Sequence, residues 1–342
     1  MSDTGARRWH ESGVVEEGDG VFRIPLPIAD SSLHATNVYV VLGEQGLTLV
    51  DAGWALDEAR QELSDGLATI GHQLSDIRDI LATHVHADHY TMAMPLRRLT
   101  GSTVALGSGE RPFLDSVMQQ IHPGVFLYPY LEQAGADDIV RELIAEGFGR
   151  RLPAGSWELP DRWLDGGEVF RIDEARDLRA VATPGHTAGH VVFIDDHAGV
   201  TFTGDHILPT ITPSIGYETP LSDSPLSDYI ASLNRVLDEP DTILLPAHGM
   251  PSPSTNSRAR DLLDHHEVRL ESCLLAVEDS GSNGVDIARR LTWTRRAKGF
   301  EELNWLNQML AVTETVAHLK VLVERDQLTV SQRGGQFIYR PR

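Results

Sequence analysis

Four side chains that commonly bind metal ions stand within six positions of the segment THVHADHY: His84, His86, Asp88 and His89. Residues two apart in an extended segment point the same way, so His84 and His86 can present their imidazoles to one point. Asp88 and His89 come where we expect the strand to turn into a helix, and they can reach a second point nearby. Imidazole and carboxylate suit zinc, and the same set can hold iron or manganese. A polar loop with scattered histidines is the alternative, which this spacing disfavours.

Three further polar residues follow apolar runs and precede turns, as residues at strand ends do. They are His186 in TPGHTAGH, Asp205 in FTGD and His248 in PAHG. A single His or Asp at a strand end is more often a capping or core residue than a ligand. The coincidence of these sites with THVHADHY nevertheless favours a metal centre at the edge of a sheet.

Short segments rich in Val, Leu and Ile predict the strands that position these residues. We expect strands over residues 21–28, 37–43, 46–53, 77–84, 102–107, 168–172, 178–184, 190–195, 199–205 and 242–248. The spacing of apolar residues predicts helices over 55–70, just before Gly101 and near 226–238. The polar residues therefore lie where apolar strands give way to turns.

Taken together, the motifs resemble those of the metallo-β-lactamase superfamily, of the glyoxalase II, lactonase and lactamase-like hydrolase type. The resemblance covers roughly residues 20–250 and includes a further motif, LVDAG, with Asp51. It implies an α/β fold, an αββα sandwich, with two divalent metal ions at the mouth between the sheets. Zinc is the expected ion, and iron and manganese are the alternatives.

The resemblance also implies a role for each site residue. One metal ion would be held by His84, His86 and His186, the other by Asp88, His89 and His248, and Asp205 would bridge the two. Asp51 would orient the ligand loop through hydrogen bonds, with a purely structural role as the alternative.

A hydroxide held between two such ions can attack a carbonyl carbon or a phosphorus atom. Asp88 would orient this nucleophile or pass a proton to the leaving group, and Tyr90 and Tyr217 are candidate hydrogen-bond donors to the oxyanion. Many true β-lactamases have cysteine at the position of Asp205, which argues against antibiotic hydrolysis. We therefore predict a hydrolase of small ester-type bonds, a thioester or a lactone.

The segment 109–165 is rich in aromatic residues and is expected to be mostly helical. As an insertion or lid over the metal centre, it would favour a substrate with a hydrophobic acyl group. The alternative is that these aromatic side chains only pack the insertion's own helices.

The composition of PSPSTNS, residues 251–257, predicts a linker between two domains. A catalytic domain over 1–253 would be followed by a winged-helix-like domain over 258–342, with helices over 258–279, 284–291 and 305–325 and a hairpin over 328–340. Such a domain would pack over the rim of the active site or form a homodimer. Its basic cluster is either a set of phosphate contacts or, as we favour, a solvated turn: Arg289, Arg290, Arg295, Arg296 and Lys298.

Charge and composition limit the class of partner. The net charge of −21 over 342 residues disfavours binding to nucleic acid and favours a small-molecule substrate. Cys273 is the single cysteine, no apolar run is long enough to span a bilayer, and no secretory signal is visible, so we expect a cytoplasmic protein without membrane contact. The alternatives are an endoribonuclease of the lactamase-like branch and a non-catalytic regulator that senses a metabolite and binds nucleic acid.

Overall fold

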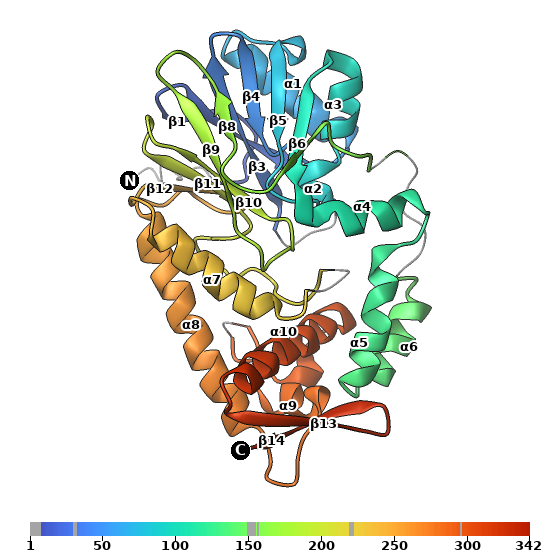
Figure 1. The fold of residues 1–342 in the computed structure, drawn as a ribbon. Helices are drawn as coiled ribbons and strands as arrows, with labels where there is room; N and C mark the ends of the chain where they lie inside the picture. The colour runs from blue at the N-terminus through green and yellow to red at the C-terminus, as the bar shows by residue number, and fades with distance from the viewer. Residues whose placement is uncertain (1–7, 30–32, 149–154, 156, 219–221, 295) are drawn as a thin grey trace, which may run out of the picture.

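Two β-sheets lie face to face in the upper half of the molecule as drawn in Figure 1. The structure, a computed structural model, describes residues 8–29, 33–148, 155, 157–218, 222–294 and 296–342. Within these residues, the first sheet has seven strands in chain order: β1 (Val15–Gly18), β2 (Val21–Pro27), β3 (Ala35–Gly43), β4 (Gly46–Val50), β5 (Ile77–Leu81), β6 (Thr103–Gly107) and β7 (Arg162–Leu164).

The second sheet has five strands within the described part of the chain: β12 (Ile243–Pro246), β11 (Val200–Gly204), β10 (Val191–Asp195), β9 (Asp177–Ala182) and β8 (Val169–Arg171). β4, β5 and β6 run parallel to one another in the first sheet, as do β11 and β12 in the second. Parallel strands bring their carboxyl ends to the same edge of a sheet, and loops from both sheets can therefore meet there.

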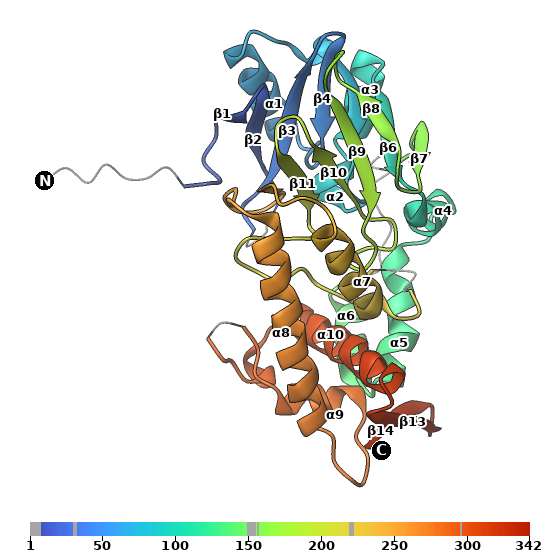
Figure 2. The same cartoon turned by 60° about the vertical axis from the view of Figure 1, so that its left-hand side comes forward.

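The space between the sheets is filled by apolar side chains. Val41, Val50 and Leu81 from the first sheet belong to the same buried cluster as Phe193 and Phe202 from the second. Helices α1 (Asp57–Thr69), α2 (Ala87–Tyr90) and α3 (Ala93–Thr100) pack on the first sheet, and α7 (Pro225–Leu237) lies below the second (Figures 1 and 2). The expected αββα sandwich is confirmed.

A helical layer lies below the sandwich in Figure 1. It contains α4 (Arg111–Met118), α5 (Leu127–Gln133), α6 (Asp137–Ala145), α8 (Thr255–Leu275), α9 (Gly284–Arg290), α10 (Trp305–Glu324) and the hairpin of β13 (Leu328–Arg333) with β14 (Gln336–Pro341). The predicted C-terminal helices and hairpin are thus present. None of the described helices has the length and apolar character needed to cross a membrane.

The C-terminal segment shares its core with the rest of the chain. Leu131 of α5, Leu143 of α6 and Leu233 of α7 belong to one buried cluster with Val312 and Leu319 of α10. Helix α8 begins at Thr255, within the predicted linker. The division into 1–253 and 258–342 therefore stays a prediction, and no separate core marks it.

The segment 109–165 is less uniformly helical than expected. Helices α4 to α6 occupy much of it, but Arg162–Leu164 form the edge strand β7 beside β6. Three residues are too few to show a strand's alternating pattern, so composition alone favoured helix here. The N-terminal strand β1 was also not predicted, since VEEG has little of the apolar character of a buried strand.

Candidate metal centre

The predicted ligands all lie just beyond strand ends at the mouth between the two sheets. His84 and His86 follow β5, and Asp88 and His89 belong to the short helix α2. The other three come from the second sheet: His186 from the loop between β9 and β10, Asp205 from the end of β11 and His248 from beyond β12. The apolar strands anchor the loops, so the polar side chains meet at the sheet edge, where most of them are buried.

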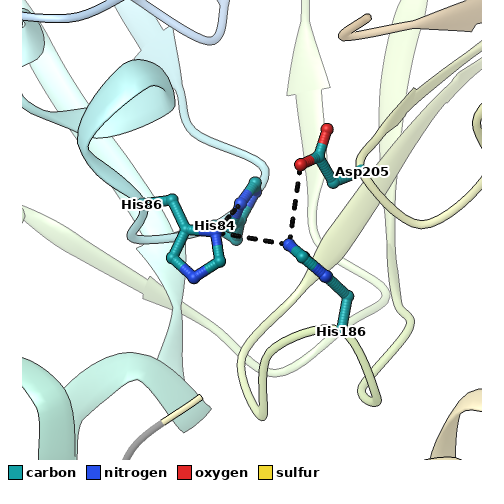
Figure 3. Close-up of side chains that lie close together, drawn as sticks. All are labelled: His84, His86, His186 and Asp205. Carbon is teal, nitrogen blue, oxygen red and sulfur yellow. Dashed lines mark hydrogen bonds and ion pairs between the residues drawn. The ribbon is translucent and has the colours of Figure 1, made fainter. Parts of the chain in front are cut away.

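Four of these side chains form a first group that could hold a metal ion: His84, His86, His186 and Asp205 (Figure 3). His84 Nε2 lies 2.9 Å from His86 Nδ1, and His186 Nε2 lies 3.3 Å from the same atom. Asp205 Oδ2 is 3.6 Å from His186 Nε2. Ligands about 2.0–2.2 Å from a tetrahedral ion lie about 3.3–3.6 Å apart, so these separations are close to those of one coordination sphere.

Asp88, His89 and His248 form a second group. Asp88 Oδ2 lies 3.5 Å from His89 Nε2 and 3.4 Å from His248 Nε2. Asp205 reaches this group as well, since its Oδ1 lies 3.3 Å from His248 Nε2 and its Oδ2 lies 3.8 Å from His89 Nε2. The carboxylate of Asp205 therefore stands between the two groups, in the position of a bridging ligand.

The hydrogen bonds of the histidines fix which nitrogen faces the centre. His186 Nδ1 donates to the carbonyl of Ser214 at 2.9 Å, and His248 Nδ1 donates to that of Ala35 at 2.8 Å. The opposite nitrogen must then carry the lone pair, because a neutral imidazole has one N–H. Buried His248 Nε2 and Asp205 Oδ1 have no hydrogen-bond partner among the described residues. Buried atoms with a lone pair and no hydrogen-bond partner, facing one another, are the arrangement that suits coordination of divalent cations.

Asp51 holds the ligand loop in place. Its carboxylate accepts from the Thr83 amide at 2.8 Å, from the Thr83 hydroxyl at 3.0 Å and from His89 Nδ1 at 2.9 Å. Its backbone is left-handed, with φ of 60°, and Asp is one of the few residues other than glycine that tolerates this region. These contacts support the orienting role over a merely structural one.

The buried carboxylates of the site favour positive charge on the groups beside them. Burial opposes a charged imidazole at His89, yet Asp88, Asp51 and Asp205 together raise its pKa to about 10. At His86, burial and the neighbouring His186 lower the pKa to about 3. Burial also opposes the charged form of Asp88, but His89 and His248 hold its pKa below the usual range. Without a metal ion, the proton on His89 supplies positive charge between these carboxylates, and a divalent metal ion that binds there can replace that proton.

An apolar cavity of about 350 Å³ adjoins both groups. His86 and Asp88 lie at its wall, and the aromatic side chains that line it are Trp54, Phe113, Phe148, Trp157 and Tyr217. Phe113, Phe148 and Trp157 come from the 109–165 segment. Tyr128 and Tyr130 of the same segment do not line the cavity but pack against the helical core, as Phe148 also does. The segment thus both covers the cavity and packs its own helices.

The two candidate tyrosines have different surroundings. Tyr217 is half-buried, lines the cavity and has its ring centroid 6.3 Å from that of His86. Tyr90 is fully buried in the core of the first sheet, and its hydroxyl donates to the Glu158 carbonyl at 2.8 Å. The expectation that Tyr90 donates to an oxyanion is wrong, because its ring is buried in this core, its hydroxyl is already bonded, and it is not among the residues that line the cavity.

Several residues that shape the site were not predicted. The Thr36 hydroxyl donates to Asp88 Oδ2 at 2.9 Å, and Glu218 lines the cavity beside Tyr217. Glu218 interacts with Glu110, whose pKa is raised to about 7 by burial. No motif marks any of these residues, because only the tertiary fold brings them together. His190 is buried near the candidate ligands and hydrogen-bonds to the Thr183 hydroxyl at 2.9 Å.

Comparisons with known proteins agree with this geometry. Residues 32–248 match the family described as the metallo-beta-lactamase superfamily. A probable metallo-hydrolase of Bacillus subtilis, YqjP, is 26% identical, covering 93% of this chain and 95% of that protein. The atrochrysone carboxyl ACP thioesterase AgnL7 of Paecilomyces divaricatus is 28% identical over 42% of each chain. The crystal structure of a metallo-beta-lactamase family protein from Thermus thermophilus superposes with a TM-score of 0.70 at 25% identity, covering 94% of this chain and 99% of that one. The chain belongs to the metallo-beta-lactamase superfamily and is a hydrolase of that fold.

Proposed function

We propose that this protein is a dinuclear metal-dependent hydrolase that cleaves a thioester or a lactone with an apolar acyl group. The observation that carries the proposal is that the candidate metal ligands lie directly beside an apolar cavity. The two groups of candidate ligands meet at Asp205, and a cavity walled by aromatic rings adjoins both groups at His86 and Asp88. An ester carbonyl at the junction would face both the ligands and the apolar wall.

His84, His86 and His186 would hold one zinc or similar ion, Asp88, His89 and His248 the other, with Asp205 between them. Divalent ions in such a site supply Lewis acidity and water that ionises near neutral pH. Side chains of the protein would transfer the proton and hydrogen-bond to the carbonyl oxygen.

Asp88 is placed to handle the proton. It lines the cavity, and Thr36 fixes one of its oxygens by a hydrogen bond of 2.9 Å. A carboxylate held in this way can orient the attacking water and return its proton to the leaving thiol or alcohol. Burial raises the pKa of Tyr217, so its phenol stays protonated at neutral pH and can donate to the carbonyl oxygen as negative charge develops there.

The choice of an ester-type substrate rests on the walls of the cavity. Aromatic side chains favour the binding of an apolar acyl chain or ring, whereas binding of a phosphodiester backbone would require cationic side chains in the cavity. No Lys or Arg lines this cavity among the described residues. The net charge of −21 also disfavours RNA. The thioesterase among the relatives supports the thioester over the phosphodiester.

A substrate panel tests the proposal. The full chain, loaded with zinc, manganese or iron(II), would be assayed with acyl thioesters, lactones, bis(p-nitrophenyl) phosphate and single-stranded RNA, with His86→Ala as the inactive control. We expect turnover of thioesters or lactones that His86→Ala abolishes. Cleavage of RNA alone would favour the endoribonuclease, and no turnover of any substrate with the metal ions bound would favour the non-catalytic regulator.

Replacing Phe148 by alanine should weaken the binding of long acyl groups. Phe148 is half-buried and lines the cavity, so its loss removes apolar contact worth about 1–2 kcal/mol. We expect KM for a long-chain or aromatic thioester to rise about 10-fold, while KM for an acetyl thioester stays within about 2-fold.

Phe126 offers a matched control for this variant. It is 42% exposed and does not line the cavity, so Phe126→Ala should leave both KM values unchanged. An equal rise in KM for the acetyl and the long-chain substrates in Phe148→Ala would argue against the cavity as the acyl site.

A further inference from the structure

A second and larger cavity, of about 980 Å³, lies away from the apolar one. Its walls come from four places: the loop 210–212 that follows Asp205, helix α8, the residues 292–294 and 296–298 after α9, and helix α10. Four cationic side chains line it: Arg258, Arg269, Arg296 and Lys298. We call it the basic cavity.

The basic cavity has an excess of positive charge in an otherwise acidic protein. The only carboxylate that lines it among the described residues is Glu314 of α10, and burial raises the pKa of this group. Two of the four cations have a carboxylate beside them: Arg258 lies 3.9 Å from Asp261, and Arg269 lies 4.0 Å from Glu314. The positive charge of Arg296 and Lys298 has no such partner among the described residues, in a chain with a net charge of −21. Such a concentration of like charge costs free energy unless an anion offsets it.

Two of the arginines are held rigidly by contacts with the main chain. Arg258 donates through Nε to the Leu208 carbonyl at 2.7 Å and through Nη2 to the Ile211 carbonyl at 2.9 Å. Arg269 donates to the Thr292 carbonyl at 3.1 Å, and its guanidinium lies 4.3 Å from the centroid of the Trp293 ring. Because these contacts fix the guanidinium groups, little side-chain entropy remains to be lost when an anion binds.

The other two cations are available to a ligand. Within the described part of the chain, the side chains of Arg296 and Lys298 make no ion pair. Their neighbours in the basic cluster recognised in the sequence differ, since Arg289 pairs with Glu301 at 3.2 Å and Arg290 with Glu278 at 2.7 Å. Arg295 lies outside the described residues. The cluster therefore divides into a neutralised part and a part that faces the cavity.

Neutral hydrogen-bond donors complete the lining. Thr210 and Thr212 come from one segment of the lining and Thr292 and Thr294 from another, so hydroxyl groups line the cavity together with the cations. A phosphate group offers several acceptor oxygens and two charges, which matches cations and hydroxyls arriving from different directions. A volume of about 980 Å³ is that of a site for a whole small molecule, not for a single ion.

From these observations we infer that the basic cavity binds a small organic phosphate with two or more negative charges, of the size of a nucleoside diphosphate. The inference does not depend on ester hydrolysis. The ligand could be a free metabolite or the phosphate-bearing end of a thioester substrate, and both share the chemistry that the cavity recognises.

The cavity is also joined to the metal centre by one loop. Arg258 holds Leu208 and Ile211, and the carbonyl of Ser214, a few residues later, accepts the hydrogen bond that orients His186. A ligand that orders this loop should therefore affect the metal ligands as well.

Calorimetric titration of the zinc-loaded full chain with ADP, in 0.15 M NaCl, tests the inference. Adenosine serves as the ligand without phosphate. We expect ADP to bind with Kd in the micromolar range and adenosine to bind at least about 100-fold more weakly. The double variant Arg296→Glu/Lys298→Glu, whose changes lie at exposed or half-buried positions, should weaken ADP binding at least about 100-fold.

Two controls separate this site from other causes. Arg60→Glu/Arg333→Glu makes the same change in net charge at exposed positions outside the cavity, and we expect it to change Kd less than about 2-fold. His86→Ala tests chelation by the metal centre and should leave ADP binding intact. Competition of ADP with a thioester substrate would identify the site as part of the substrate site, and binding without competition would identify a free metabolite.

The inference is overturned if ADP fails to bind at millimolar concentration, or if both double variants bind it equally. If His86→Ala abolished ADP binding while Arg296→Glu/Lys298→Glu still bound ADP, the ADP site would be the metal centre and not the basic cavity. Tight binding of single-stranded RNA together with no binding of ADP would replace the small phosphate by a nucleic acid. Failure of this proposal leaves ester hydrolysis untouched, since the two are measured separately.

Discussion

His186→Ala and Asp88→Asn are each expected to lower the metal content from about two ions per chain to about one. Each change removes a ligand from a different group, so fewer protein donors remain to hold that ion and it is bound more weakly. With one ion missing, we expect kcat for the best ester substrate to fall at least about 1000-fold. Elemental mass spectrometry on protein purified without chelators, followed by the ester assay, measures both effects.

His197→Ala is the matched control for these two variants. His197 is exposed on the turn between β10 and β11 and belongs to neither group. Its loss should change neither metal content nor kcat. If His186→Ala and Asp88→Asn also retained two ions per chain, the assignment of the ligand groups would be wrong.

Asp51→Ala should damage the centre without removing a ligand. The variant leaves three donors of the ligand loop without their acceptor: the Thr83 amide, the Thr83 hydroxyl and His89 Nδ1. Loss of such an outer contact costs about 10- to 100-fold in metal affinity. Breaking a buried charged network also costs about 3–5 kcal/mol of the free energy of unfolding. Competition with a chelating dye and chemical denaturation measure the two effects.

Asp195→Ala separates these effects, because Asp195 is an equally buried carboxylate far from the ligands. It pairs with Arg176 at 2.5 Å, so its loss also leaves a buried charge unpaired. We expect Asp195→Ala to lose comparable stability and to keep its metal affinity. Equal losses of metal affinity in both variants would mean that Asp51 acts on stability alone.

The sequence predicted which His and Asp side chains lie close together, because these residues follow strand ends. His84, Asp205 and His248 each follow an apolar run, and such runs are the most readable feature of a buried strand. The sandwich that brings these ends together came from the resemblance of the motifs to a known family. Periodicity alone would have given strands and helices without their pairing order.

The parts that sequence reasoning missed depend on tertiary contacts. Tyr90 follows a ligand directly in sequence, but one turn of helix points its ring into the core. Thr36 reaches Asp88 from 52 positions away, and nothing in its local sequence marks it. The basic cluster was favoured as a solvated turn. Arg258 and Arg269 of α8 could be grouped with Arg296 and Lys298 only once the helix was seen to pass beside that turn.

The central claim is that two metal ions support ester hydrolysis, and a metal titration with paired activity measurements tests it most directly. Metal-free protein would receive zinc, manganese or iron(II) in steps, with bound metal and thioester or lactone turnover measured at each step. We expect turnover to rise until about two ions per chain are bound and then to level off. Full activity at one ion per chain, or none at two, would contradict a dinuclear hydrolase.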